Sequence, residues 1–174
     1  MHRDLLEQAR HLLDIDPRRP RQANLRRAVS TAYYAAFHCL GSATTELILP
    51  ARHQELRAII RRALDHSAMK KAASAFGGGT PPALYLPALN VPPTGRATLE
   101  PELRELAAAF VNLQEQRHTA DYDLSRPMTR HAASEAVDQA DLVIANDEAL
   151  RSNGSTNYEV FLLALLLQKN LDKR

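Results

Sequence analysis

The sequence predicts an all-α fold, a helical bundle of four to six helices. Apolar residues recur at spacings of three and four in several segments, which is the period of an amphipathic helix. No segment alternates apolar and polar residues for long enough to indicate a strand, and β-branched residues are too sparse for a sheet. With 45% apolar and 24% charged residues, a chain of 174 residues can bury a hydrophobic core.

Three helices are predicted in the N-terminal half, and the second has the clearest pattern. Short helices fit residues Asp4–Leu13 and Gln54–Lys71. The segment Asn24–Leu40 places apolar side chains on one face, namely Leu25, Val29, Ala32, Ala36 and Leu40. Cys39 lies in this apolar stretch, so we expect a buried structural thiol. A single cysteine excludes both an internal disulfide and a cysteine-based zinc site.

Residues 75–98 interrupt the helical pattern. They contain five prolines and four glycines without periodicity, which predicts a long Pro/Gly-rich insert between two helices. A lid, a partner-binding loop and a mobile insert are the alternatives that the sequence leaves open, and a mobile insert is the simplest of them.

The C-terminal half predicts three more helices. Residues Glu100–Thr119 carry an apolar stripe made of Leu103, Leu106, Phe110 and Leu113. Thr129 is a suitable N-cap for a helix that runs to about Leu150. The last segment, Asn157–Arg174, is apolar on all sides between Phe161 and Leu167, so it has to be buried. We therefore expect a bundle over residues 1–150 and a C-terminal helix, within 151–174, that packs on the bundle or on a second subunit of a homodimer.

Composition limits the classes of function and the location. The first twenty residues carry charges throughout, and the longest apolar run, Val160–Leu167, is too short to cross a bilayer, so we expect a cytoplasmic protein without membrane contact. The net charge is only +2, so binding to RNA would need a local basic patch. Gly77–Gly79 lacks the residues of a phosphate-binding loop, and no two histidines have the spacing of a helical zinc site. We expect neither a cofactor nor a metal.

Arg117 stands out because it continues the Leu103–Leu113 stripe at helical spacing, where another apolar residue is expected. A guanidinium turned toward a core needs a partner, and the nearest acids are Asp121 and Asp123. His118 and Tyr122 complete the densest polar cluster of the chain. One interpretation is a helix C-terminus in which Arg and His complement the helix dipole; the other is a functional site that lines a cleft.

Three segments together resemble a bacterial branch of the HEPN families. They are Ala28–His38, which contains Ala-Tyr-Tyr, then Arg62–His66, and then Leu113–Asp123, which contains Arg-His-x-Ala-Asp-Tyr-Asp. The resemblance extends over roughly residues 21–144. It implies a compact bundle of about four core helices that is frequently a dimer.

The resemblance also implies a function. Many HEPN proteins are metal-independent ribonucleases with an Arg, four to six residues and then a His, and some are toxins paired with a nucleotidyltransferase. In this chain Tyr122 stands where the histidine is expected from Arg117, and His118 is adjacent to the arginine instead. Arg61 with His66 and Arg126 with His131 do have the spacing, about as often as chance predicts. If the His66 helix lies against the end of the Arg117 helix, a composite site forms.

Two functions from different classes follow as alternatives. In the first, RNA is cleaved through its 2′-hydroxyl without a metal: His118 or His66 is the base, Arg117 binds the phosphate, and Tyr122 holds or donates a hydrogen bond. In the second, the chain is a catalytically silent helical module that binds a nucleotide or a partner protein such as a nucleotidyltransferase. The missing histidine, the low net charge and the apolar last helix favour the second alternative.

Overall fold

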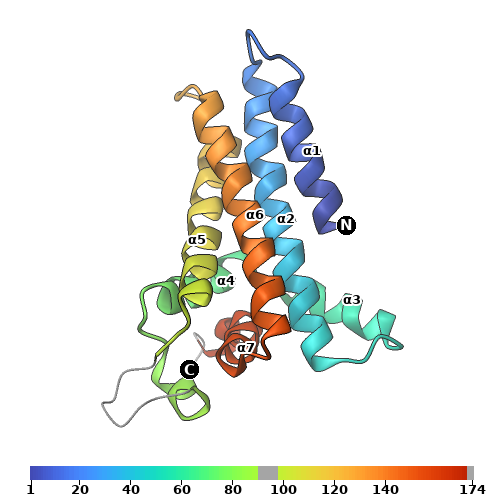
Figure 1. Cartoon of the computed structure of the whole chain (residues 1–174), viewed down its shortest axis with the longest axis vertical. Helices are drawn as coiled ribbons and strands as arrows, with labels where there is room; N and C mark the ends of the chain where they lie inside the picture. The colour runs from blue at the N-terminus through green and yellow to red at the C-terminus, as the bar shows by residue number, and fades with distance from the viewer. Residues whose placement is uncertain (90–97, 172–174) are drawn as a thin grey trace. The chain divides into compact units, whose positions relative to one another are not determined.

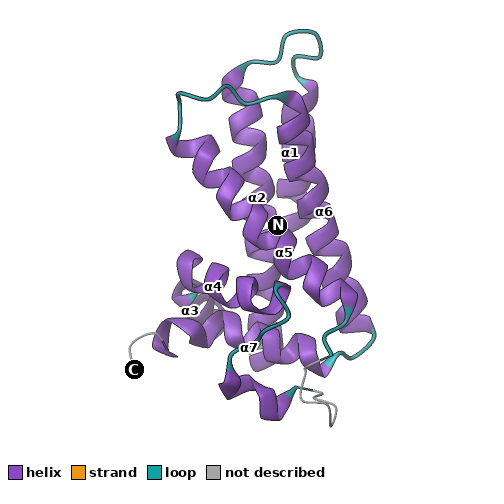
Figure 2. Ribbon diagram, turned by 90° about the vertical axis from the view of Figure 1, so that its left-hand side faces the viewer, coloured by secondary structure: helices purple, strands orange, loops and turns teal. Residues whose placement is uncertain are grey.

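The structure, a computed structural model, describes residues 1–89 and 98–171 and contains only helices within them. Figure 2 shows helices joined by loops, with no strand in these two ranges. In chain order the elements are α1 (His2–Asp14), α2 (Gln22–Ile48), α3 (Gln54–Ala63), α4 (His66–Gly77), the 3-10 helix η1 (Ala83–Ala88), α5 (Pro101–Tyr122), α6 (Arg130–Ser152) and α7 (Thr156–Leu171). The all-α prediction is therefore confirmed. Over the described ranges, no helix is long and apolar enough to cross a membrane.

The predicted number of helices was too low, because the predicted helix Gln54–Lys71 is two helices. Leu64 has an extended backbone, with φ −65° and ψ 126°, and the chain restarts as α4 after Asp65. The Asp65 carboxylate accepts hydrogen bonds from the backbone N–H groups of Ser67 and Ala68, at 3.0 and 3.1 Å, so it satisfies two N–H groups that the first turn leaves unpaired. The described chain thus has seven α-helices where six segments were predicted.

Replacing Asp65 with alanine should lower the free energy of unfolding by about 1 kcal/mol at neutral pH, the usual cost of losing an N-cap. The N–H of Ala68 and the side chain of Ser67 lower the pKa of Asp65 from 3.8 to about 2. A lowered folded-state pKa stabilises the protein above the unfolded pKa, and this stabilisation is lost as the pH falls through the folded pKa. Denaturant unfolding of wild type and Asp65→Ala should therefore converge between pH 4 and pH 2. A difference that stays constant down to pH 2 would contradict the capping role.

The predicted insert at residues 75–98 begins later than expected. Helix α4 continues to Gly77, and η1 follows at Ala83–Ala88, while residues 90–97 of the insert lie outside the described part of the chain. Gly77 is needed where α4 ends, since a Cβ there would lie 3.1 Å from the backbone nitrogen of Ala108 in α5. The glycine thus permits close approach of the two helices.

Two compact units make up the fold, and each has its own core. Unit 1 is residues 1–39 and 109–145; unit 2 is residues 40–108 and 146–174. In unit 1, α1 and the unit's parts of α2, α5 and α6 lie side by side (Figures 1 and 2). Its core contains many alanines, which let helices approach closely, and the rings of Tyr33 and Phe110 join α2 to α5 at 5.8 Å. Cys39 is buried, as predicted.

Helix α7 belongs to the core of unit 2. It packs against α4 and η1, and the rings of Phe161 and Phe76 lie 5.2 Å apart. Half of its residues are buried, among them Tyr158, Phe161 and Leu165, while Leu163 and Leu167 stay partly exposed. Packing within the chain therefore accounts for most of the apolar surface of α7.

Helix α6 begins where the sequence predicts. The Thr129 hydroxyl accepts a hydrogen bond from the N–H of Ala132 at 3.1 Å, so Thr129 is the N-cap, as predicted. This cap also fixes the point at which the loop from α5 ends, and the candidate site lies at the start of that loop.

Candidate functional site

The last turn and a half of α5 carries the Arg117 cluster, which we define as Arg117, His118, Asp121 and Tyr122 of α5 with Tyr34 of α2. All five residues belong to unit 1. The buried stripe Leu103, Leu106, Phe110 and Leu113 turns Arg117 toward α2, and the Arg117 side chain remains only 22% exposed. Arg117 thus lies against other groups of unit 1, and a cleft lined by it stays a prediction.

The Arg117 guanidinium contacts Asp121 and two tyrosines. Its Nε lies 2.6 Å from Asp121 Oδ2, one helical turn away. This contact is an ion pair rather than a hydrogen bond, because the Nε–H does not point at the oxygen. Arg117 Nη2 donates to the Tyr34 hydroxyl at 3.3 Å, and the guanidinium carbon lies 5.7 Å from the Tyr34 ring centre and 5.4 Å from that of Tyr122. The cation therefore lies near the faces of two aromatic rings, where it is attracted to both.

Charge and protonation of the cluster follow from these contacts. Burial lowers the pKa of the Arg117 guanidinium, but the neighbouring Tyr34, Asp121 and Tyr122 together raise this pKa above its ordinary value. Arg117 is therefore a permanent cation. The buried Ser30 hydroxyl donates to the second oxygen of Asp121, which fixes the carboxylate from the α2 side. Asp121 thus joins α2 to Arg117.

His118 lies on the solvent side of this cluster. Its ring centre is 5.0 Å from that of Tyr122, one turn further along α5, and both side chains are exposed. The imidazole is thus accessible to a ligand, and its ring lies against that of Tyr122. An exposed imidazole can take a proton from the hydroxyl of a bound ligand at neutral pH.

Asp123 does not pair with Arg117, although the sequence left that pairing open. Its carboxylate accepts from the N–H of Ser125 at 3.1 Å and also from the Ser125 hydroxyl, and it lies 3.6 Å from Arg126. The Ser125 hydroxyl and N–H, together with Arg126, lower the pKa of Asp123 despite its partial burial. Asp123 therefore shapes the turn after α5.

Arg26 of α2 holds the end of α5 in place. Its Nη1 donates to the backbone oxygens of Ala120 at 2.8 Å and of Asp123 at 3.0 Å, and its Nη2 donates to the backbone oxygen of Arg126. These carbonyls come from the last turn of α5 and the following loop, where the helix no longer supplies donors. Arg26 is therefore a cap for the end of a helix almost a hundred residues away along the chain.

Arg61 and His66 belong to unit 2, whereas the residues of the Arg117 cluster belong to unit 1. Arg61 is in the last turn of α3 and His66 is the first residue of α4, so the helix break separates them. Arg126 and His131 have separate partners: Arg126 pairs with Asp123, and His131 lies 3.2 Å from Glu135. The composite site with Arg117 stays a prediction. Within the described ranges, no cluster of three or more His, Cys, Asp or Glu residues could hold a metal ion.

A pocket of about 320 Å³ lies in unit 1, next to the face of α5 that carries Gln116 and Thr119. Gln116 and Thr119 line it from α5, and Pro127 and Met128 line it from the loop before α6. The Gln116 Oε1 atom is buried and has no hydrogen-bond partner among residues 1–89 and 98–171. An apolar pocket with one unpaired acceptor suits a flat group that carries an N–H donor.

Sequence reasoning missed a second polar cluster, which lies in unit 2. Asp147 of α6 is buried and accepts a hydrogen bond from the Tyr158 hydroxyl of α7. Arg151 lies 3.7 Å from Asp147 and 2.5 Å from Glu46. The spacing in the sequence could have indicated this cluster, because Asp147 continues the apolar stripe of Ala140 and Val143. Arg117 continues the stripe of α5 in the same way.

Comparison of the chain with family models, with curated proteins and with solved structures finds no match. The contacts of the two polar clusters are therefore the basis for any functional proposal.

Proposed function

We propose that the chain is a HEPN-like protein that binds RNA at the Arg117 cluster and cleaves it through the 2′-hydroxyl without a metal. The observation that supports this best is a fixed cation, Arg117, with the exposed imidazole of His118 next to it in sequence. In such a reaction the 2′-oxygen attacks the phosphorus, the bond to the 5′-oxygen breaks, and a 2′,3′-cyclic phosphate forms. His118 takes the 2′-proton, and Arg117 stabilises the charge on the phosphate oxygens.

The neighbouring groups have supporting roles in this proposal. Tyr34 and Asp121 orient the guanidinium, and Tyr122 holds the His118 ring. The pocket lined by Gln116 and Thr119 offers a surface for a base of the same RNA. One histidine cannot take and give a proton simultaneously, so the proton for the 5′-oxygen comes from water or from the second chain of a homodimer.

A catalytically silent binding module is the second candidate, and one contact favours it. Asp121 already neutralises Arg117, so a phosphate would have to compete with that carboxylate. In this case the same surface binds a nucleotide or a partner protein of the nucleotidyltransferase type.

The two candidates separate in an RNA-cleavage assay in the presence of EDTA. Wild-type protein should cleave single-stranded RNA or tRNA and leave cyclic phosphate ends, and His118→Ala should reduce the rate by about 10²–10⁴-fold, the usual contribution of a general base. His131→Ala is the matched control: it removes another exposed histidine of unit 1, paired with Glu135, and should keep the wild-type rate. Intact RNA after incubation with wild type, with and without divalent metal, would favour the binding module.

A further inference from the structure

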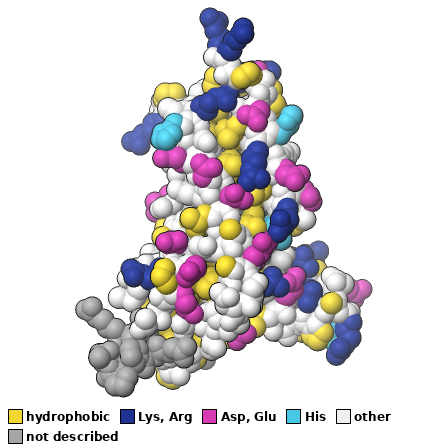
Figure 3. Space-filling model, in the orientation of Figure 1, with side chains coloured by type: hydrophobic (Ala, Val, Ile, Leu, Met, Phe, Trp, Pro, Cys, Tyr) yellow, Lys and Arg dark blue, Asp and Glu magenta, His cyan; other side chains and the backbone are white. Residues whose placement is uncertain are grey.

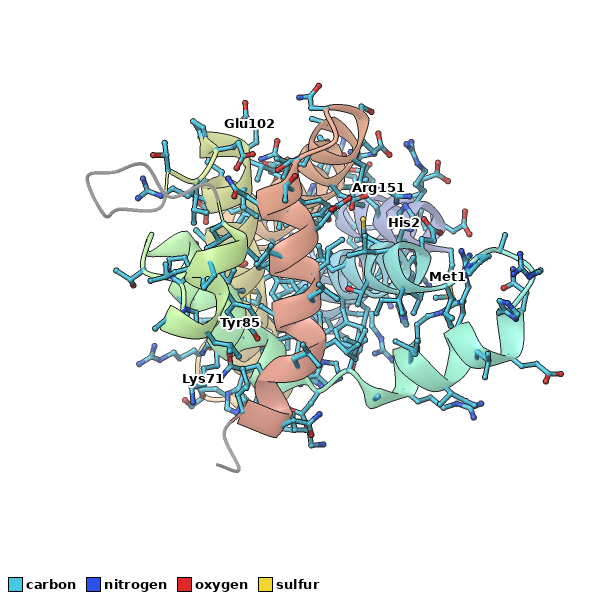
Figure 4. All side chains as sticks on the ribbon, turned by 90° about the horizontal axis from the view of Figure 1, so that it is seen from below. Met1, His2, Lys71, Tyr85, Glu102 and Arg151 are labelled. Carbon is cyan, nitrogen blue, oxygen red and sulfur yellow. The ribbon has the colours of Figure 1, made fainter. Side chains whose placement is uncertain are left out.

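Helix α3 in unit 2 exposes its apolar side. None of its ten residues is buried, although the segment has a strongly amphipathic pattern. Leu56 is 48% exposed and Ile59 is 59% exposed, which are large fractions for aliphatic side chains on a regular helix. In Figures 1 and 4, α3 lies at the margin of its unit, apart from α7.

Three exposed apolar residues and the half-buried Ile60 form one stripe along α3. Leu56, Ile59, Ile60 and Ala63 have the spacing i, i+3, i+4, i+7, so they share one face. Figure 3 shows hydrophobic atoms beside basic ones at the lower right, in the region of α3. An amphipathic helix normally buries such a stripe, so a surface that covers it has to come from outside the described fold.

The polar side of α3 is the side that is anchored. Both Nε and Nη2 of Arg57 donate to the backbone oxygen of Leu49, at 3.1 and 2.7 Å. Arg61, on the side opposite the stripe, is half-buried. These contacts hold the helix with its apolar stripe outward. The stripe is therefore exposed because of the way in which α3 is attached to its unit.

The charges beside the stripe indicate what covers it. Glu55 and Arg62 are both exposed, and their spacing of seven residues puts them on the same flank of the stripe at opposite ends of the helix. A two-fold axis perpendicular to α3 would place a second α3 antiparallel to the first. In that arrangement Glu55 of each chain faces Arg62 of the other.

The apolar residues of the stripe also fit a two-fold axis perpendicular to α3. In the register that centres between Ile59 and Ile60, Ile59 of one chain lies beside Ile59 of the other, Ile60 lies beside Ile60, and Leu56 is level with Ala63. Bulky side chains thus meet at the centre, and a leucine meets the small alanine at each end. The same register thus covers the apolar stripe and places both Glu55–Arg62 pairs next to it.

We propose that α3 is a self-association surface, through which two copies of this chain pair as an antiparallel two-fold helix pair. The pairing gives a surface to the proposed homodimer and does not depend on the nuclease activity. A ten-residue helix is about 15 Å long, and its stripe is smaller than the roughly 800 Å² per partner of a standard stable interface. The dimer is therefore reversible and depends on protein concentration.

Sedimentation equilibrium over a range of concentrations tests the surface. Ile59→Asp should raise the dimer dissociation constant by at least about tenfold, because it places a carboxylate at the centre of the stripe. Leu163→Asp is the matched control, since Leu163 is a partly exposed leucine on α7 in the same unit and should leave the constant unchanged. If Leu163→Asp abolishes the dimer and Ile59→Asp does not, α7 is the interface and the proposal is wrong.

Charge exchange tests the register. Glu55→Arg alone and Arg62→Glu alone should each weaken the dimer, and the double variant Glu55→Arg with Arg62→Glu should restore it, because the exchanged charges again face each other. A double variant no better than the single ones would overturn the antiparallel register. A monomeric wild type that binds vesicles containing phosphatidylserine through α3 would overturn self-association in favour of an anionic surface.

Discussion

Replacing Arg117 with alanine should reduce RNA cleavage by about 10²–10³-fold, the loss measured when one group that stabilises a transition-state oxyanion is removed. The free energy of unfolding should change by less than about 1 kcal/mol, because the ion pair with Asp121 is partly open to solvent. Asp121 is 28% exposed and keeps its hydrogen bond from Ser30, so losing the guanidinium does not strand a buried charge.

Two measurements on each protein separate the roles of Arg117. Cleavage under single-turnover conditions reports the chemical step, and urea unfolding reports stability. Arg10→Ala is a suitable control, since Arg10 forms an exposed ion pair with Asp141 at 3.0 Å in the same unit, and we expect no change in either quantity. A loss of several kcal/mol in Arg117→Ala would mean that the cluster is structural, and wild-type cleavage by this variant would remove Arg117 from the proposed mechanism.

The largest effect on stability is expected for Tyr158→Phe, which should lower the free energy of unfolding by about 2 kcal/mol. The substitution keeps the ring that packs on Phe161 and removes only the hydroxyl that donates to the buried carboxylate of Asp147. A hydrogen bond to a charged group contributes more than one between neutral groups, and a buried carboxylate that loses a donor is not compensated by water.

Tyr85→Phe provides the matched control in the same unit. Tyr85 is buried, but its hydroxyl has no hydrogen-bond partner within the described part of the chain. Burial alone raises the pKa of this phenol. Removing a buried, unpaired hydroxyl should leave stability unchanged or increase it slightly, so the two Tyr→Phe variants should differ by about 2 kcal/mol in urea unfolding. Equal values for both would show that the Tyr158–Asp147 contact contributes nothing beyond ring packing.

The helices could be predicted from the sequence where one apolar stripe persists for several turns. The periodicity of α2 and α5 indicated where these helices lie, although α2 continues eight residues beyond the predicted end at Leu40, and Thr129 indicated the start of α6. The break between α3 and α4 was missed because Leu64 fits both the helical pattern and the extended conformation that it adopts. Asp65, followed by Ser67, was a local signal for a new helix, since both residues are suited to the first turn.

The candidate site could be predicted only on its α5 side. Arg117, Asp121 and Tyr122 are joined by spacings within one helix, and the structure confirms these contacts. Tyr34 contributes from 83 residues away, and no spacing in the sequence indicates that contact. Partners that meet through tertiary packing cannot be inferred from one sequence, whereas partners one turn apart can.

The contacts that close unit 1 also determine when it can form during synthesis. Gln22 exchanges two hydrogen bonds with the backbone of Met128, at 2.8 and 2.7 Å, and Arg26 binds the backbone around residues 120–126. Each of these contacts spans about a hundred residues of chain. The N-terminal helices therefore leave the ribosome long before the groups that complete their packing. At 5–20 residues per second, the usual rate of translation, the apolar face of α2 is exposed for about 5–20 s before the residues that complete its packing have been synthesised.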